Sequence, residues 1–443
     1  MKKIIVLTTA TALLSSCGIY TKYQPAETTP DNLYGEEVAV DDTTNFGNVN
    51  WRELFTDPQL QALIEQGLQN NTDLRSAQLQ IEEAEAALMS AKLAFLPSFA
   101  LSPQGTISSF DKNAATKTYS LPVTASWQVD LFGQLLNSKR NAQVTLKQMK
   151  AYRQAVQTQV VSNIANMYYT LMMLDRQLEI TKATAEILKK NAETMEAMKD
   201  AAMYSINSAG VEQSKAAYAQ VLASIPDIEQ SIRETENALS TLLGEAPHAI
   251  KRGELEAQVL PTELSAGVPI QLLSNRPDVK QAEYTLAQAF YATNEARAAF
   301  YPALTISGNY EFRHSLYDIV GSLVQPLFHR GTLKANLDIA KAEQKEADIS
   351  FRQTIIEAGI EVNDALVAVK SAREKAENYS KQVKHLQDAV KSTQLLMKHG
   401  STTYLEVLTA QQTLLEAQVN QVTNHLTEIS NTITLYQALG GGR

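Results

Sequence analysis

Cysteine is nearly absent from the chain, since Cys17 is the only one among 443 residues. A lone cysteine excludes an intrachain disulfide and any metal site built from several thiolates. The six histidines show no ligand spacing, so we expect surface or structural roles for them and neither a metal nor a cofactor. They are His248, His314, His329, His385, His399 and His425.

A surplus of basic residues is also missing. Lys and Arg number 39 against 48 Asp and Glu, and the net charge of −9 argues against a nucleic-acid partner. The sequence shows no nucleophile beside a base and no phosphate-binding loop, which leaves catalysis without support. We therefore expect a protein that is not an enzyme.

Glycine and proline are both absent from residues 134–209. This predicts one very long helix, about 100 Å at 1.5 Å per residue. Apolar and small residues recur along it in alternating steps of three and four, which is the heptad pattern of a coiled coil. They are Met167, Leu171, Leu174, Leu178, Thr181, Ala185, Leu188, Ala192 and Met195. A helix of this length must connect separate regions.

The N-terminus carries a targeting signal. Lys2 and Lys3 precede an apolar stretch, residues 4–14, that is too short to span a bilayer, so residues 1–16 are predicted to be a secretory signal. Residues 14–17 (Leu-Ser-Ser-Cys) resemble the bacterial lipobox, in which the cysteine is acylated. An ordinary cleavage site is the alternative. Gly18 resembles the following residue of lipoproteins sent to the outer membrane, and residues 17–57 are expected to form a lipidated tether.

Two segments alternate apolar and polar residues. Residues 98–109 and 119–131 are predicted strands, and the second alternates strictly from Tyr119 to Leu131. Strands of this length and pattern fit a transmembrane β-hairpin, although a half-buried hairpin of a soluble sandwich has the same pattern.

The whole pattern then repeats. Residues 296–302 (ARAAFYP) echo residues 91–97 (AKLAFLP). We predict a first repeat over 58–244, with one helix over 58–96, a long helix over 133–203 and a tip turn near 204–210. A connector follows over 245–274. The second repeat, 275–443, holds strands over 303–313 and 317–328 and a long helix over 331–399.

Four strands cannot close a cylinder, and open edges in lipid would cost several kcal/mol per unpaired backbone group. The chain is therefore expected to oligomerise. Eight strands from a dimer would be filled by side chains, whereas twelve from a trimer leave a lumen. The residues expected to line the lumen are Gln128, Asp130, Asn309, Glu311 and Arg313.

Several short motifs, in this order and spacing, resemble the TolC-type outer membrane efflux family and its lipoprotein branch. They are residues 130–133 (DLFG), 276–278 (RPD), 300–302 (FYP) and 400–410 (GSTTYLEVLTA), within a resemblance that covers residues 51–440. The resemblance implies a mainly α protein with a membrane β-barrel: a homotrimer whose twelve-stranded barrel continues into an α-helical periplasmic tunnel. It also implies a periplasmic adaptor (membrane fusion protein) and an inner membrane pump of the resistance-nodulation-division (RND) type.

The same resemblance points to the periplasmic entrance. The family commonly has two acidic residues after the second tip turn, and here Glu406 stands at the first position and Thr409 at the second. Thr402 stands where some members have an arginine that ties the tip closed, and Leu405 lies beside these positions. The tip turns are expected at Gly210, Gly400 and Ser401.

The function expected is a passive outer membrane conduit of a tripartite efflux system. Two alternatives remain at this point: a lipid-anchored periplasmic coiled-coil adaptor or scaffold without a pore, and the outer membrane duct of a type I protein secretion system. The exported substrate cannot be predicted, because a duct receives its cargo after the pump has selected it.

Overall fold

The computed structural model describes residues 20, 22–24, 33–34, 45–109, 114–200, 208–258, 275–311, 316–326, 330–399 and 401–442. The predictions for Cys17, Arg313 and Gly400 lie outside these residues. The chain forms two compact units. The first holds residues 20–24, 77–153 and 277–355, and the second holds residues 33–76, 154–276 and 356–442, each within the described ranges.

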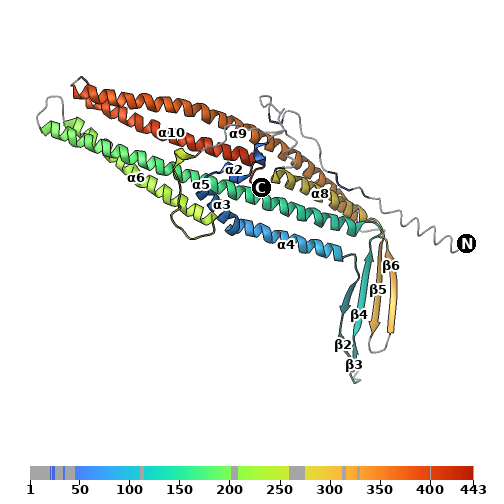
Figure 1. Cartoon of the computed structure of the whole chain (residues 1–443). Coiled ribbons are helices and arrows are strands. Elements are labelled where there is room, and N and C mark those ends of the chain that lie inside the picture. Colours follow the sequence, from blue (N-terminus) through green and yellow to red (C-terminus); the bar gives the residue numbers. More distant parts are fainter. Residues whose placement is uncertain are drawn as a thin grey trace. The chain divides into compact units, whose positions relative to one another are not determined.

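The first unit contains the strands (Figure 1). A four-stranded antiparallel sheet has the order β1-β4-β5-β6, and β2 pairs with β3. The bounds are β1 Ser98–Leu101, β2 Gln104–Ser108, β3 Thr116–Ser120, β4 Pro122–Val129, β5 Ala303–Glu311 and β6 Leu316–Val324. Each of the two predicted strands of the first hairpin is therefore broken once. The breaks fall beside Pro103 and Pro122, because proline has no N–H to donate to a ladder.

The register places apolar residues of neighbouring strands on one face of the sheet. Val123 pairs with Tyr310, and Trp127 pairs with Ile306. The side chains of Phe99, Ile319 and Leu323 on this face are largely exposed. Thr124, Ser126 and Gln128 pair with Asn309, Ser307 and Thr305 on the opposite face. The sheet thus has one apolar and one polar face, as the alternation predicts.

The helices show the duplication through their lengths. The pairs are α4 Thr72–Leu93 and α8 Pro277–Ala298, with 22 residues each; α5 Gln134–Asp200 and α9 Thr332–Lys398, with 67 each; and α6 Ser208–Leu242 and α10 Tyr404–Ala438, with 35 each. Gly133 and Gly331, at φ +76° and +78°, immediately precede the two long helices. The two halves of the chain therefore have the same plan.

One predicted helix is wrong. Residues 58–96 form two helices, α3 Pro58–Asn70 and α4, with Asn71 between them. The Asn71 side chain accepts hydrogen bonds from the backbone N–H groups of Asp73 and Leu74, and it donates to the carbonyl of Leu242. Asn71 therefore caps the N-terminus of α4 and ends α3, although no Gly or Pro marks the position.

The second unit is organised around the coiled-coil pattern of α5. Leu171, Thr181, Ala185, Leu188 and Met195 are all buried. The short elements η2 Phe46–Asn48 and α2 Trp51–Leu54 attach the end of the tether, and η3 Leu255–Ala257 lies in the connector. Among the described residues, no helix is both long and apolar enough to cross a membrane.

Candidate functional site

The start of α10, in the second unit, divides the predicted entrance residues between two faces. Thr403 precedes the helix in an extended conformation. Tyr404, Val407 and Leu408 are buried, whereas Leu405 is 55% exposed. Glu406 is also exposed. The residues expected at the entrance therefore point away from the packed face.

The buried face of α10 packs on the hairpin of the first repeat. Tyr404, Val407 and Leu408 form one hydrophobic cluster with residues of α5 and α6. Those residues are Ala185, Leu188, Met195, Val211, Ala217 and Val221. This cluster attaches the beginning of the second return helix to the tip half of the first hairpin.

Two polar contacts accompany the cluster. The hydroxyls of Tyr404 and Ser214 form a buried hydrogen bond of 2.8 Å. Burial raises the pKa of the Tyr404 phenol above its ordinary value, and the bond to Ser214 lowers it in part. Farther along α10, Gln411 Oε1 accepts a hydrogen bond of 2.9 Å from Nδ2 of Asn191, which belongs to α5. The two hairpins are thus joined by specific hydrogen bonds as well as by apolar packing.

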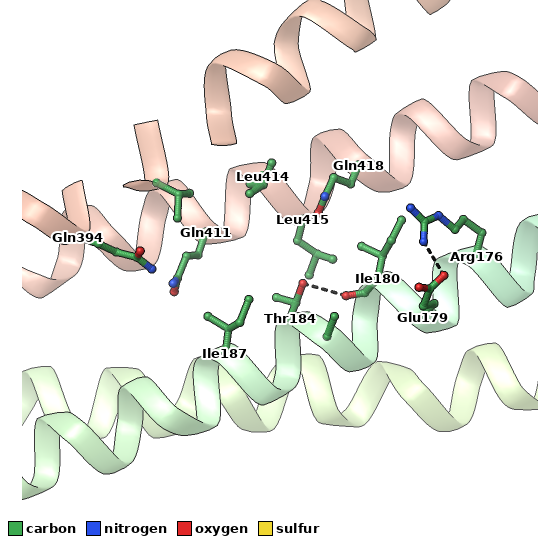
Figure 2. A pocket seen from close by; sticks show the side chains of 12 residues that line it. Arg176, Glu179, Ile180, Thr184, Ile187, Gln394, Gln411, Leu414, Leu415 and Gln418 are labelled. Carbon is green, nitrogen blue, oxygen red and sulfur yellow. Dashed lines mark hydrogen bonds and ion pairs between the residues drawn. The ribbon is translucent and has the colours of Figure 1, made fainter. Parts of the chain in front are cut away.

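Beyond these contacts a cavity of about 270 Å³ opens between α5, α9 and α10. Figure 2 shows Gln411 facing Ile187, and Leu415 facing Thr184, across it. Gln411 is buried, and its Nε2 has no acceptor among the described residues. Thr184 donates its hydroxyl to the carbonyl of Ile180 at 2.9 Å.

The exposed face of the tip has its own hydrogen bonds. The Thr402 hydroxyl donates to a carboxylate oxygen of Glu406. Glu406 lies in the first turn of α10, where the partial positive charge of the helix N-terminus favours a carboxylate. Thr409 donates its hydroxyl to the carbonyl of Leu405 at 2.9 Å, and the Ser401 N–H donates to Leu396 at 2.9 Å.

The structure corrects one predicted turn residue. Gly210 was expected in the first tip turn, but α6 begins at Ser208 and includes it. A glycine in a helix costs only about 0.5–1 kcal/mol relative to alanine, so its presence does not exclude a helix here. Gly400 lies outside the described residues.

Polar residues predicted for the barrel lumen have varied surroundings. Asn309 lies across from Thr124 and Asp318 in the sheet. Gln128 Nε2 donates to Gln134 Oε1 at 3.3 Å. Asp130 follows the end of β4, and its carboxylate accepts the N–H of Leu136 at 2.7 Å, so it caps α5.

Glu311 has a structural contact as well. Its carboxylate accepts the N–H of Leu121 at 3.0 Å, at the break between β3 and β4. This bond satisfies a donor at the break in the ladder. Arg313 lies outside the described residues.

The sequence did not indicate the contacts of Ser214 and Asn191. Ser214 is separated from Tyr404 by 190 positions, and Asn191 is separated from Gln411 by 220. No local motif marks such pairs. Gln411 gives the one available signal, because it is a polar residue on the buried face of α10 and such a residue needs a hydrogen-bond partner. Among the described residues, no group of three or more His, Cys, Asp or Glu side chains could hold a metal ion.

The chain is similar in sequence to several outer membrane efflux proteins. The chain is 29% identical to the cation efflux system protein CusC of Escherichia coli K12, over 97% of each chain. It is 28% identical to the probable outer membrane lipoprotein SilC of Salmonella typhimurium, over 99% of this chain and 98% of that one. The toluene efflux pump outer membrane protein TtgC of Pseudomonas putida is 28% identical over 100% and 96%.

A crystal structure of CusC, described in terms of transmembrane channel formation, matches the fold with a TM-score of 0.86 at 27% identity, covering 96% of this chain and 100% of that one. The family model for outer membrane efflux proteins matches residues 63–245 and 268–441, which correspond to the two repeats. The chain therefore belongs to the outer membrane efflux protein family.

Proposed function

We propose that this chain is the outer membrane channel of a tripartite efflux system, a passive conduit without catalytic activity. The open four-stranded sheet carries the proposal. Its apolar face is exposed, its register is continuous across β1, β4, β5 and β6, and its order leaves β1 and β6 at the edges. An antiparallel sheet with one exposed apolar face and one polar face suits a barrel wall between lipid and water.

Closure of the sheet requires more copies. Unpaired strand edges in lipid are costly, so β6 of one copy pairs with β1 of the next. Three copies supply twelve strands and a lumen, whereas two would supply eight, which side chains fill. The assembly is a homotrimer in the outer membrane, and its helices extend into the periplasm.

The partners are a periplasmic adaptor and an inner membrane pump of the RND type. The names of the relatives support a conduit that does not choose its cargo. CusC is named for cation efflux and TtgC for toluene efflux, yet this chain is 29% and 28% identical to them. Substrate selection then belongs to the pump.

The tip around Glu406 is the periplasmic entrance. The three copies of Glu406 form one ring of carboxylates, and the family's second acidic position carries Thr409. The Thr402 hydroxyl orients each Glu406 carboxylate. Attachment of α10 through Tyr404 and Gln411 keeps the entrance narrow.

The N-terminus is held in the membrane by acylation of Cys17. The lipobox-like residues 14–17 and the lipoprotein name of SilC support this assignment. Intact mass of the purified protein should show acyl chains that the Cys17→Ala variant lacks. An unmodified Cys17 would refute the lipid anchor while leaving the channel untouched.

Single-channel recording in planar bilayers tests the main proposal. A detergent-extracted trimer should conduct ions. A folded trimer without conductance would favour the scaffold alternative. Deletion of the gene should sensitise cells to small toxic compounds, whereas loss of an exported protein without such sensitivity would favour the type I secretion duct.

A further inference from the structure

The two repeats end their return helices in the same turn. After α6, the N–H of Gly244 bonds to Thr241 and that of Glu245 to Ser240, at 3.1 and 3.0 Å. After α10, the N–H of Gly440 bonds to Gln437 and that of Gly441 to Tyr436, both at 2.9 Å. Each pattern is a Schellman-type cap, with the glycine at φ +71° or +84°.

The neighbours of the turns also correspond. A methyl group added at Gly244 would lie 2.9 Å from the carbonyl oxygen of Asn70, and one added at Gly440 would lie 2.9 Å from that of Asn275. Asn70 ends α3, and Asn275 precedes α8. The two turns therefore occupy equivalent places in their repeats.

What covers the turns differs. In the second repeat, Gly440, Gly441 and Gly442 are buried. Gln157 of α5 donates to the carbonyl of Gly442 at 3.3 Å, and a methyl group added at Gly442 would lie 3.2 Å from the Cα of Thr158. The turn of the second repeat thus covers one face of α5 within the same chain.

The corresponding surfaces of the first turn and of α9 are both exposed. Gly244, Glu245 and Ala246 are exposed. On α9, Ile356 and Ile360 occupy the positions that Thr158 and Ser162 occupy on α5, counted from the start of each helix. Thr158 and Ser162 are 4% and 2% exposed, whereas Ile356 and Ile360 are 41% and 51% exposed.

The opposite face of α9 is already used. Ile355, Ala358 and Val362 are buried within the chain. At 3.6 residues per turn, Ile356 and Ile360 lie far around the helix from this buried stripe. A second apolar face on one helix calls for a second partner.

We infer that a second copy of the chain supplies this partner, placing its Gly244–Ala246 turn over Ile356 and Ile360. The contact repeats between copies the one that Gly442 and Thr158 make within a chain. It joins different surfaces of the two copies, which is the kind of contact that closes a ring in a trimer. The inference rests on the proposed trimer and identifies the surfaces that hold it together outside the barrel.

Disulfide trapping tests the contact. In the Ala246→Cys/Ile356→Cys variant, oxidation should join copies and give covalent dimers and trimers on a non-reducing denaturing gel, because the in-chain template brings the equivalent atoms within disulfide reach. Each single variant, which also retains Cys17, should give no covalent trimer on the same gel. The matched control is Ala246→Cys/Lys384→Cys, whose α9 position lies about 42 Å farther along the helix and should not crosslink.

A second variant tests the same surface without a thiol. Ile360→Glu adds a charge to a side chain that is exposed in the single chain, so helix content by circular dichroism should stay unchanged while the trimer dissociates at a lower detergent concentration or temperature on native mass analysis. A trimer that conducts ions yet neither crosslinks nor responds to Ile360→Glu would overturn the inference and leave the proposed channel intact. A chain that never forms a trimer would refute both.

Discussion

Removal of one hydroxyl at the tip tests whether α10 is held by specific bonds or by apolar packing alone. Tyr404→Phe keeps the ring in the hydrophobic cluster and deletes only the hydrogen bond to Ser214. Ser214 is 0% exposed, so water does not replace the lost partner. The substitution therefore isolates a single buried contact between α10 and α6.

The size of the effect follows from that geometry. A neutral hydrogen bond contributes about 1 kcal/mol net, and a buried group left without a partner costs about 1–3 kcal/mol. The Ser214 hydroxyl can turn to a carbonyl one helical turn back in α6, which limits the penalty. We expect Tyr404→Phe to weaken the attachment of α10 by about 1–2 kcal/mol. This lowers the ratio of attached to detached α10 by about 5- to 30-fold.

Single-channel recordings report this ratio as the fraction of time spent in high-conductance openings. Tyr404→Phe should raise that fraction and make cells leaky to large antibiotics. Ser214→Ala should act similarly, and the double variant should be no worse than either single one, because both partners are then apolar. Equal open fractions for wild type and Tyr404→Phe would refute the idea that this bond holds the tip.

Three further predictions concern neighbouring groups. Glu406→Gln should lower cation selectivity and block by multivalent cations, and an unchanged current-voltage relation would make Glu406 an ordinary surface residue. Asp130→Ala should cost about 1 kcal/mol through loss of the α5 cap, measured as a lower midpoint of thermal unfolding, whereas Asp130→Asn should retain most of it. Burial raises the pKa of Tyr404, so its contribution to tip stability is complete below pH 10 and falls as the pH rises beyond 10. The increase in open fraction on raising the pH should therefore be larger in wild type than in Tyr404→Phe. Equal increases in the two proteins would contradict this.

The sequence predicts those features that depend on local period and on helix breakers. The absence of Gly and Pro over residues 134–209 indicates the long helix, whose described part ends at Asp200. Strict alternation predicts the two faces of the sheet.

The remaining features depend on residues far apart in the chain. The break at Asn71 needs an asparagine side chain that both caps α4 and reaches Leu242. Asp130, predicted for the lumen from its place in the alternation, also caps a helix, because the strand ends one residue earlier. Neither outcome follows from periodicity, since each depends on where a neighbouring element ends.

The two repeats also show why equal backbones need not carry equal side chains. The α5 face beneath the C-terminal turn carries Thr158 and Ser162, and Gly442 lies against this face in the same chain. The equivalent face of α9 carries two isoleucines, which a protomer alone would leave in water. Fully burying an isoleucine side chain contributes about 1.5–3 kcal/mol. Ile356 and Ile360 are 41% and 51% exposed, so each contributes roughly half of that on association, and the apolar pair stabilises an assembly more than a separate protomer. Duplication thus supplies the same contact between turn and helix twice, once within a chain and, in our inference, once between copies. The more apolar version is on α9, where the partner is a separate chain.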